Sequence, residues 1–114
     1  MKIIKDKIKI EELKEMAKKM FGNLVKVVVD VEKEIMVLNG ELHSDEQELL
    51  IEKGSQPKDL WGINIYPEIK NENWIEFDSV INLKPYFGNR TRGGVEDPEI
   101  KEKIIKIINK LIER

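Results

Sequence analysis

Three segments of the chain carry apolar residues at the spacing of an amphipathic helix. Gly22 is placed to stop the first of them. Ser44 and Gln47 form a capping-box pattern at the start of the second, while Asp97 and Pro98 are a favoured N-cap and first residue for the third. The expected helical ranges are 10–21, 44–54 and 98–112.

Outside these helices, apolar and polar residues alternate with the period of two that half-buried strands show. The expected strands are 1–5 at a sheet edge, 23–33, 34–40, 41–43, 60–66 and 74–84. Alternation, rather than continuous apolar runs, favours antiparallel pairing. We therefore expect a single domain, 1–114, of the α+β class: a mainly antiparallel sheet of about five strands with about three helices packed on one face.

Composition and charge narrow the class of protein. The chain has 37% charged residues, a formal net charge of −2 and no cysteine. No overall positive field attracts nucleic acid, and disulfides and Cys-ligated zinc are excluded. No apolar run is long enough to span a membrane, and the N-terminal residues lack the apolar core of a secretory signal. We expect a cytoplasmic protein without a membrane or nucleic-acid partner.

Lysine and glutamate dominate the charged residues, as they do in proteins of hyperthermophiles. An AT-rich genome would favour the same lysine and isoleucine codons, so a thermophilic source is one of two explanations.

The only histidine, His43, stands between the carboxylates Glu41 and Asp45. In a strand these three side chains would share one face and could hold Mg²⁺ or Mn²⁺. Ser44, however, resembles a helix N-cap, and one histidine does not supply the usual ligands of catalytic zinc. We therefore expect no metal and no cofactor, and Glu41 and His43 are candidates for a general base.

Two neighbouring strands carry polar residues that could line a cleft. Asp78 and Asn82 share a face of one expected strand, and Asn64 lies on the strand before it, near Trp61. If that face is open, these groups could bind a ligand. The alternative is a solvated sheet face on which the tryptophan is a core anchor.

Arg90 and Arg92 stand two residues apart in the glycine-rich segment 88–94, in a chain with 17 lysines and only three arginines. The planar guanidinium binds carboxylate or phosphate through two hydrogen bonds, which lysine does not reproduce. The flanking glycines allow free backbone N–H groups to surround an anion. Glu96 and Asp97 follow closely and are the obvious internal partners, so an anion site and internal salt bridges are both open.

Four segments resemble an uncharacterised prokaryotic family of small single-domain proteins, a domain of unknown function. They are NGELHSDEQELL, DLWGINIYPE, IEFDSVINLKP and GNRTRGGVEDPEI, and the resemblance extends over nearly the whole chain. The resemblance implies a shared fold and supplies no activity, cofactor or residue role. Lys9 is a departure, because members of that family carry a serine there that would cap the first helix.

Two hypotheses of function follow. In the first, a binding or regulatory module holds an anionic small molecule or an acidic protein segment at the Arg90/Arg92 loop. Its ligand-binding residues would be Arg90, Arg92, Asn64, Asn82 and Trp61. In the second, a small hydrolase-like enzyme acts on a phosphate-bearing substrate, with Glu41, His43, Asp78 and Arg90 converging. The wide apolar stripe of the last helix could also meet a second copy of the chain.

Overall fold

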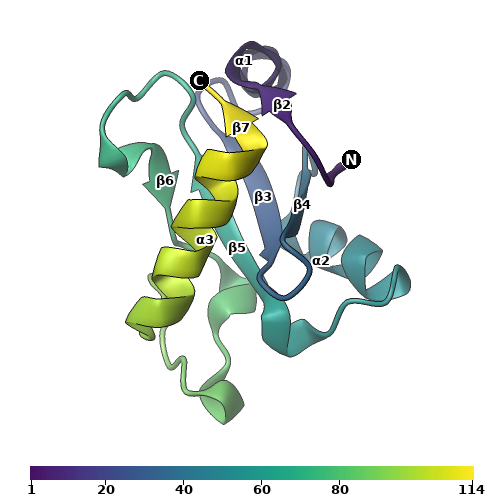
Figure 1. Cartoon of the computed structure of the whole chain (residues 1–114), viewed down its shortest axis with the longest axis vertical. Coiled ribbons are helices and arrows are strands. Elements are labelled where there is room, and N and C mark those ends of the chain that lie inside the picture. The colour runs from purple at the N-terminus through teal and green to yellow at the C-terminus, as the bar shows by residue number, and fades with distance from the viewer.

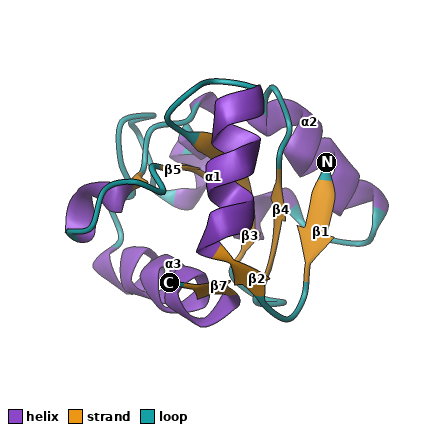
Figure 2. Ribbon diagram, turned by 90° about the horizontal axis from the view of Figure 1, so that it is seen from above, coloured by secondary structure: helices purple, strands orange, loops and turns teal.

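The computed structural model describes all residues from 1 to 114 and confirms the α+β class. Its main sheet has five strands in the order β1-β4-β3-β5-β6, and every neighbouring pair is antiparallel. Figure 1 shows β3 to β6 of this sheet, and Figure 2 shows β1 beside β4. The strands are β1 (Lys2–Ile4), β3 (Val25–Asp30), β4 (Ile35–Leu38), β5 (Leu60–Ile65) and β6 (Ile75–Glu76). The N-terminal strand lies at the sheet edge and β3 and β4 form a hairpin, as the sequence predicts.

A second, two-stranded sheet joins the beginning and the end of the chain. Here β2 (Ile8–Lys9) pairs in parallel with β7 (Ile112–Glu113), directly before the first helix and after the last one. The sequence does not predict this pairing, because strands of two residues carry no periodic signal.

The three helices are α1 (Ile10–Lys19), α2 (His43–Glu52) and α3 (Pro98–Leu111). The predicted start of α3 is confirmed, because the Asp97 side chain accepts a hydrogen bond from the Glu99 N–H at 2.9 Å. Four short 3-10 turns complete the fold, at Pro57–Asp59, Glu72–Trp74, Val80–Asn82 and Pro85–Phe87.

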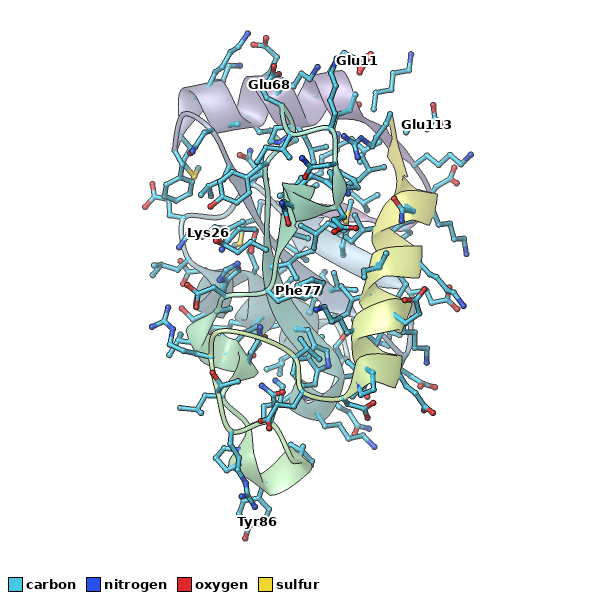
Figure 3. The ribbon with its side chains drawn as sticks, turned by 90° about the vertical axis from the view of Figure 1, so that its left-hand side faces the viewer. Glu11, Lys26, Glu68, Phe77, Tyr86 and Glu113 are labelled. Carbon is cyan, nitrogen blue, oxygen red and sulfur yellow. The ribbon has the colours of Figure 1, made fainter.

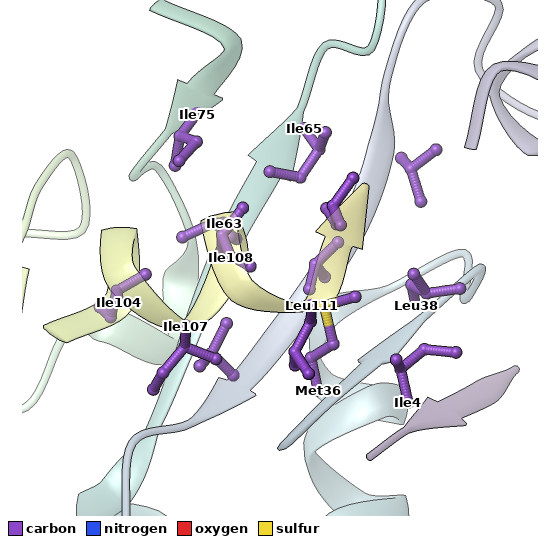
Figure 4. Close-up of a cluster of buried hydrophobic side chains, with 14 of the residues drawn as sticks. Ile4, Met36, Leu38, Ile63, Ile65, Ile75, Ile104, Ile107, Ile108 and Leu111 are labelled. Carbon is purple, nitrogen blue, oxygen red and sulfur yellow. The ribbon is translucent and has the colours of Figure 1, made fainter. Parts of the chain in front are cut away.

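The helices cover both faces of the sheet, so the prediction that they share one face is wrong. Residues of α1 and α3 pack with one face in a large apolar core, whereas Leu50 of α2 packs with Val28, Val37 and Leu60 on the other. Figure 2 shows α2 and α3 on opposite sides of the sheet, and Figure 4 shows the larger core. α3 contributes four fully buried side chains to it, Ile104, Ile107, Ile108 and Leu111. Burying each contributes roughly 1.5–3 kcal/mol.

The segment before α2 is not a strand, in contrast to the prediction for residues 41–43. α2 begins at His43 with Leu42 as its N-cap, so Ser44 lies within the first turn and the predicted capping box is absent. Asn39, with φ of 70°, turns the chain out of β4 and leads it into the helix. His43 is therefore a helical residue whose side chain turns back onto the sheet.

The predicted strand 74–84 is also wrong beyond Glu76. After β6 ends, the amide of Asn82 takes the place that a strand would have beside β5. Its Oδ1 accepts from the Gly62 N–H at 2.8 Å, and its Nδ2 donates to the carbonyls of Gly62 at 2.9 Å and Phe77 at 3.0 Å. A buried side chain thus satisfies the edge of β5, and the backbone is free to turn.

Residues 83–89 form a tip that projects from one end of the molecule, with Tyr86 outermost (Figure 3). An isolated antiparallel β-bridge between the backbones of Lys84 and Asn89 closes the base of this tip. None of the helices has the length and apolar character that crossing a membrane requires.

Candidate functional site

A hollow of about 340 Å³ lies on the α2 face of the sheet, just beyond the first residues of α2. We call it the Arg92 hollow. It is lined by Leu24, Lys26, Leu42, His43, Ser44, Asn64, Asp78, Ser79, Val80 and Arg92. Lys26 of β3 and Asn64 of β5 are cross-strand partners, so the floor of the hollow is formed by these two neighbouring strands. Figure 3 shows Lys26 on the side of the molecule away from α3.

His43 is held in one tautomer. Its Nε2 lies 2.8 Å from the carbonyl oxygen of Ile63, which can only accept, so Nε2 carries the proton. Nδ1 makes no hydrogen bond within the chain and is not an enclosed atom. Because the side chain lines the Arg92 hollow, the free lone pair of Nδ1 is available there.

Burial lowers the pKa of His43 below its ordinary value of 6.5, and the nearby cations Lys26 and Arg92 act in the same direction. The hydrogen bond to Ile63 and the charge of Asp78 oppose this shift. The ring is therefore a neutral acceptor at pH 7.

Gly62 explains why the His43 ring can lie against the sheet. A Cβ at this position would lie 2.4 Å from Ser79 Oγ and 3.1 Å from His43 Cγ. The ring and the Ser79 hydroxyl therefore occupy the space that any other residue would fill. The absence of this one side chain brings α2 and the segment after β6 together over β5.

Arg92 reaches the hollow through a contact with Asp78. Its Nε–H donates to Asp78 Oδ1 at 3.2 Å, and both side chains are about half exposed. The backbone holds this arrangement, because the Ser79 N–H donates to the Arg92 carbonyl at 3.0 Å. With Lys26, the hollow has two cations and a single carboxylate on its wall.

Asn64 leaves one polar atom without a partner. Its Nδ2 donates to Glu76 Oε1 at 2.8 Å and to the Asp78 carbonyl at 3.1 Å, which fixes the orientation of the amide. Its Oδ1 is enclosed and receives no hydrogen bond. A buried acceptor without a donor costs about 1–3 kcal/mol, so the fold leaves the pairing of this amide incomplete.

Comparison with protein families identifies this chain. A model of the family described as "Protein of unknown function (DUF5674)" matches residues 2–111. The chain belongs to the DUF5674 family. This bears out the resemblance seen in the sequence, and it assigns no reaction or ligand to the DUF5674 chain. No curated protein and no solved structure matches it.

The Arg92 hollow of this DUF5674 protein brings together some of the predicted site residues. Four of them line it: His43, Asn64, Asp78 and Arg92. Glu41 is exposed and lies outside the hollow. Arg90 is also outside, so the convergence expected for four hydrolase residues is seen only for His43 and Asp78, between which there is no hydrogen bond.

The arginines do not form the internal salt bridges that the sequence left open. Arg92 pairs with Asp78 instead of Glu96 or Asp97. Arg90 contacts Glu96 only through its backbone N–H, which donates to Glu96 Oε2, and its exposed side chain forms no ion pair.

Asn82 and Trp61, which were predicted to bind the ligand, are buried and do not line the Arg92 hollow. Asn82 has no exposed surface, and its amide is fully used by the backbone groups of Gly62 and Phe77. Trp61 is 2% exposed and faces the opposite side of the sheet from Gly62 and Asn64. Neither lines the Arg92 hollow.

The polar lining residues that sequence reasoning missed are Lys26, Ser44 and Ser79. A sequence signal for Lys26 did exist, because it is the only cation in a strand that is rich in valine. No sequence signal marked Ser79, because its place in the hollow depends on the absence of a side chain at Gly62. No three His, Asp or Glu side chains are grouped as metal ligands.

Proposed function

We propose that this DUF5674 protein binds a small molecule with an anionic group in the Arg92 hollow. The observation that supports this most is the convergence of Lys26 and Arg92 on one concave surface beyond the N-terminus of α2. Both side chains and the positive end of the helix dipole favour an anion there. The proposal keeps the predicted anionic ligand and, of the two predicted arginines, retains Arg92 and leaves out Arg90.

The ligand is small and also carries a hydrogen-bond donor. A volume of about 340 Å³ lies at the lower end of the range for small-molecule sites. His43 Nδ1 lacks a donor from the chain and is not enclosed, so a hydroxyl or amino group beside the anionic group can donate to it.

A titration followed by amide NMR tests this proposal with inorganic phosphate, acetate and glycolate as probes. We expect resonances of residues 43, 44 and 92 to shift, and glycolate to bind more tightly than acetate because its hydroxyl can donate to His43. Arg92→Gln should weaken phosphate binding about tenfold, since a charged hydrogen bond is lost.

Arg90→Gln is the matched control, because it removes the same charge from the same loop outside the hollow. It should change phosphate affinity less than about twofold. Equal effects of the two substitutions, or no shifts at the hollow, would contradict the proposal.

A second candidate function is hydrolysis of a phosphate-bearing substrate. It is favoured by the neutral His43 ring, whose free Nδ1 could accept a proton from water as the water oxygen attacks phosphorus and the leaving oxygen departs. The test is turnover of p-nitrophenyl phosphate. Hydrolytic activity should rise with pH through a pKa below 6.5, and it should be lost in His43→Gln. Binding of phosphate without any turnover would contradict hydrolysis and would support anion binding alone.

A cytoplasmic location, a thermophilic source and a homo-oligomeric state are proposals from composition and pattern. Cell fractionation would test the location, the melting temperature would test the thermophilic source, and sedimentation would test the oligomeric state.

A further inference from the structure

A second hollow, of about 300 Å³, lies on the α3 face of the sheet, where α3 begins and the tip returns to the body of the molecule. We call it the Trp61 hollow. Its walls include Trp61, Phe87, Glu96 and Asp97. It shares no lining residue with the Arg92 hollow.

The indole of Trp61 is a buried donor without an acceptor. The residue is 2% exposed, and Nε1 makes no hydrogen bond. A buried tryptophan N–H normally has a partner. Trp61 is one of the residues that line the hollow. Its N–H is enclosed, so a small shift of the neighbouring side chains would bring it within reach of a carbonyl oxygen of a bound molecule.

The two carboxylates of this hollow keep free oxygens. Glu96 Oε2 accepts from the Arg90 N–H, and Asp97 Oδ1 accepts from the Glu99 N–H at 2.9 Å. Neither residue belongs to any ion pair of the chain. Glu96 Oε1 and Asp97 Oδ2 are thus available to a cation from outside.

The one cation near the indole is already occupied. Lys84 Nζ lies 4.9 Å from the centre of the Trp61 ring and donates to the carbonyls of Pro57 and Ile81, each at 3.0 Å. Burial lowers the pKa of Lys84 to about 8, so the amine stays mostly protonated at pH 7 and its N–H groups stay with these two carbonyls.

Aromatic side chains extend the hollow outward along the tip. Phe87 lines the hollow and is 59% exposed, and Tyr86 beside it is 98% exposed. Figure 3 shows Tyr86 at the extreme end of the molecule. Exposed aromatic residues of this kind are enriched at protein–protein interfaces and pack well against the stems of long side chains.

We propose that the Trp61 hollow and the tip dock a basic segment of another protein. A lysine or arginine of that segment pairs with Glu96 and Asp97, a backbone carbonyl accepts from the Trp61 N–H, and neighbouring apolar groups pack on Phe87 and Tyr86. The aromatic rim favours a peptide over a free small cation, because it continues beyond the hollow. This proposal is independent of the Arg92 hollow.

The probe is a capped pentapeptide, acetyl-Gly-Leu-Arg-Leu-Gly-amide, compared with the same peptide carrying glutamine for arginine. Binding is followed by NMR of the two indole N–H resonances, with Trp74 as the internal reference. We expect the Trp61 N–H resonance to move downfield with the arginine peptide, and the glutamine peptide to bind at least about tenfold more weakly.

The test variant is Glu96→Gln with Asp97→Asn, which removes both charges and keeps a good N-cap for α3. Glu99→Gln with Glu102→Gln is the matched control, since it removes two charges from the first turns of α3, outside the hollow. The first pair should weaken arginine-peptide binding about tenfold and the second less than about twofold. Phe87→Ser, at an exposed position, should also weaken it.

Three results would overturn the proposal. They are equal binding of the two peptides, an unmoved Trp61 resonance, and equal losses in the test and control variants. Concentration-dependent sedimentation that Glu96→Gln with Asp97→Asn abolishes would instead assign the surface to a second copy of this chain.

Discussion

Trp61 and Gly62 are neighbours on β5 and face two different surfaces. On the α2 face, Gly62 lies under the Arg92 hollow, where two cations meet one carboxylate. On the α3 face, Trp61 lines a hollow with two carboxylates and no free cation. One strand therefore separates two surfaces of opposite charge, because successive side chains of a strand point to opposite faces.

The segment between β6 and α3 supplies residues to both hollows, and its buried asparagines hold it. Asn82 binds the backbone of Gly62, while Asn89 Nδ2 donates to the carbonyls of Asn82, Thr91 and Gly94. Arg90, Arg92, Glu96 and Asp97 of the same segment are exposed, whereas Asp78 is half-buried and Lys84 is buried. Buried amides thus determine the shape of the two surfaces, and exposed charges determine what each surface attracts.

The largest expected effect comes from Asn82→Ala. It leaves three buried backbone groups without partners, and we expect a loss of about 4 kcal/mol in the free energy of unfolding, measured by urea denaturation. Ligand binding at both hollows should fall together. Asn23→Ala, at an exposed position, is the control, and a loss below about 1 kcal/mol in Asn82→Ala would contradict the structural role.

Gly62→Ala should separate the two hollows. The new Cβ would meet Ser79 and the His43 ring, and we expect a loss of about 2–3 kcal/mol together with weaker phosphate binding. Arginine-peptide binding at the Trp61 hollow should be retained. Gly94→Ala is the control, because nothing lies within 4 Å of its Cβ position. A phosphate affinity unchanged in Gly62→Ala would place the anion site elsewhere.

Glu46 tests whether a buried polar group outside both hollows is costly. It is fully enclosed by α2 and Gly40, whose N–H donates to Oε2 at 3.0 Å, and burial raises its pKa to about 9. The folded state therefore holds a proton that the unfolded state releases, so stability falls as the pH rises from about 4.5 to about 9.

Glu46→Gln should remove this dependence and stabilise the protein by about 2–3 kcal/mol at pH 7, in thermal melts across the pH range. Glu48→Gln, exposed on the same helix, should have little effect. Parallel pH profiles of wild type and Glu46→Gln would show that the carboxyl is ionised in the folded state.

The smallest effect on stability is expected for Arg92→Gln. The Arg92–Asp78 pair is exposed, and such pairs contribute roughly 0–1 kcal/mol. We expect an unfolding free energy within about 0.5 kcal/mol of wild type, in the same variant that weakens phosphate binding tenfold. A large loss of stability would make Arg92 a structural residue and would remove the contrast between buried amides and exposed charges.

Several elements could be predicted from local signals alone. Asp97 and Pro98 mark the start of α3, and the alternating valines of β3 mark the strand that packs against the main core. The site could be predicted only in part. The sequence marks His43, Asn64, Asp78 and Arg92 as candidates. It offers only Glu96 and Asp97 as ion-pair partners of Arg92, because the actual partner, Asp78, lies 14 positions away.

The sequence by itself determined the class of fold, the family and most element positions, because caps, turns and periodicity act between near neighbours. Only the tertiary structure decided which face of the sheet each helix covers, where the strand after Trp74 ends, and which charges share a hollow. Asn82 shows the reason. Its amide competes with a strand by binding Gly62, 20 residues earlier, and no local pattern reports a contact between residues so far apart.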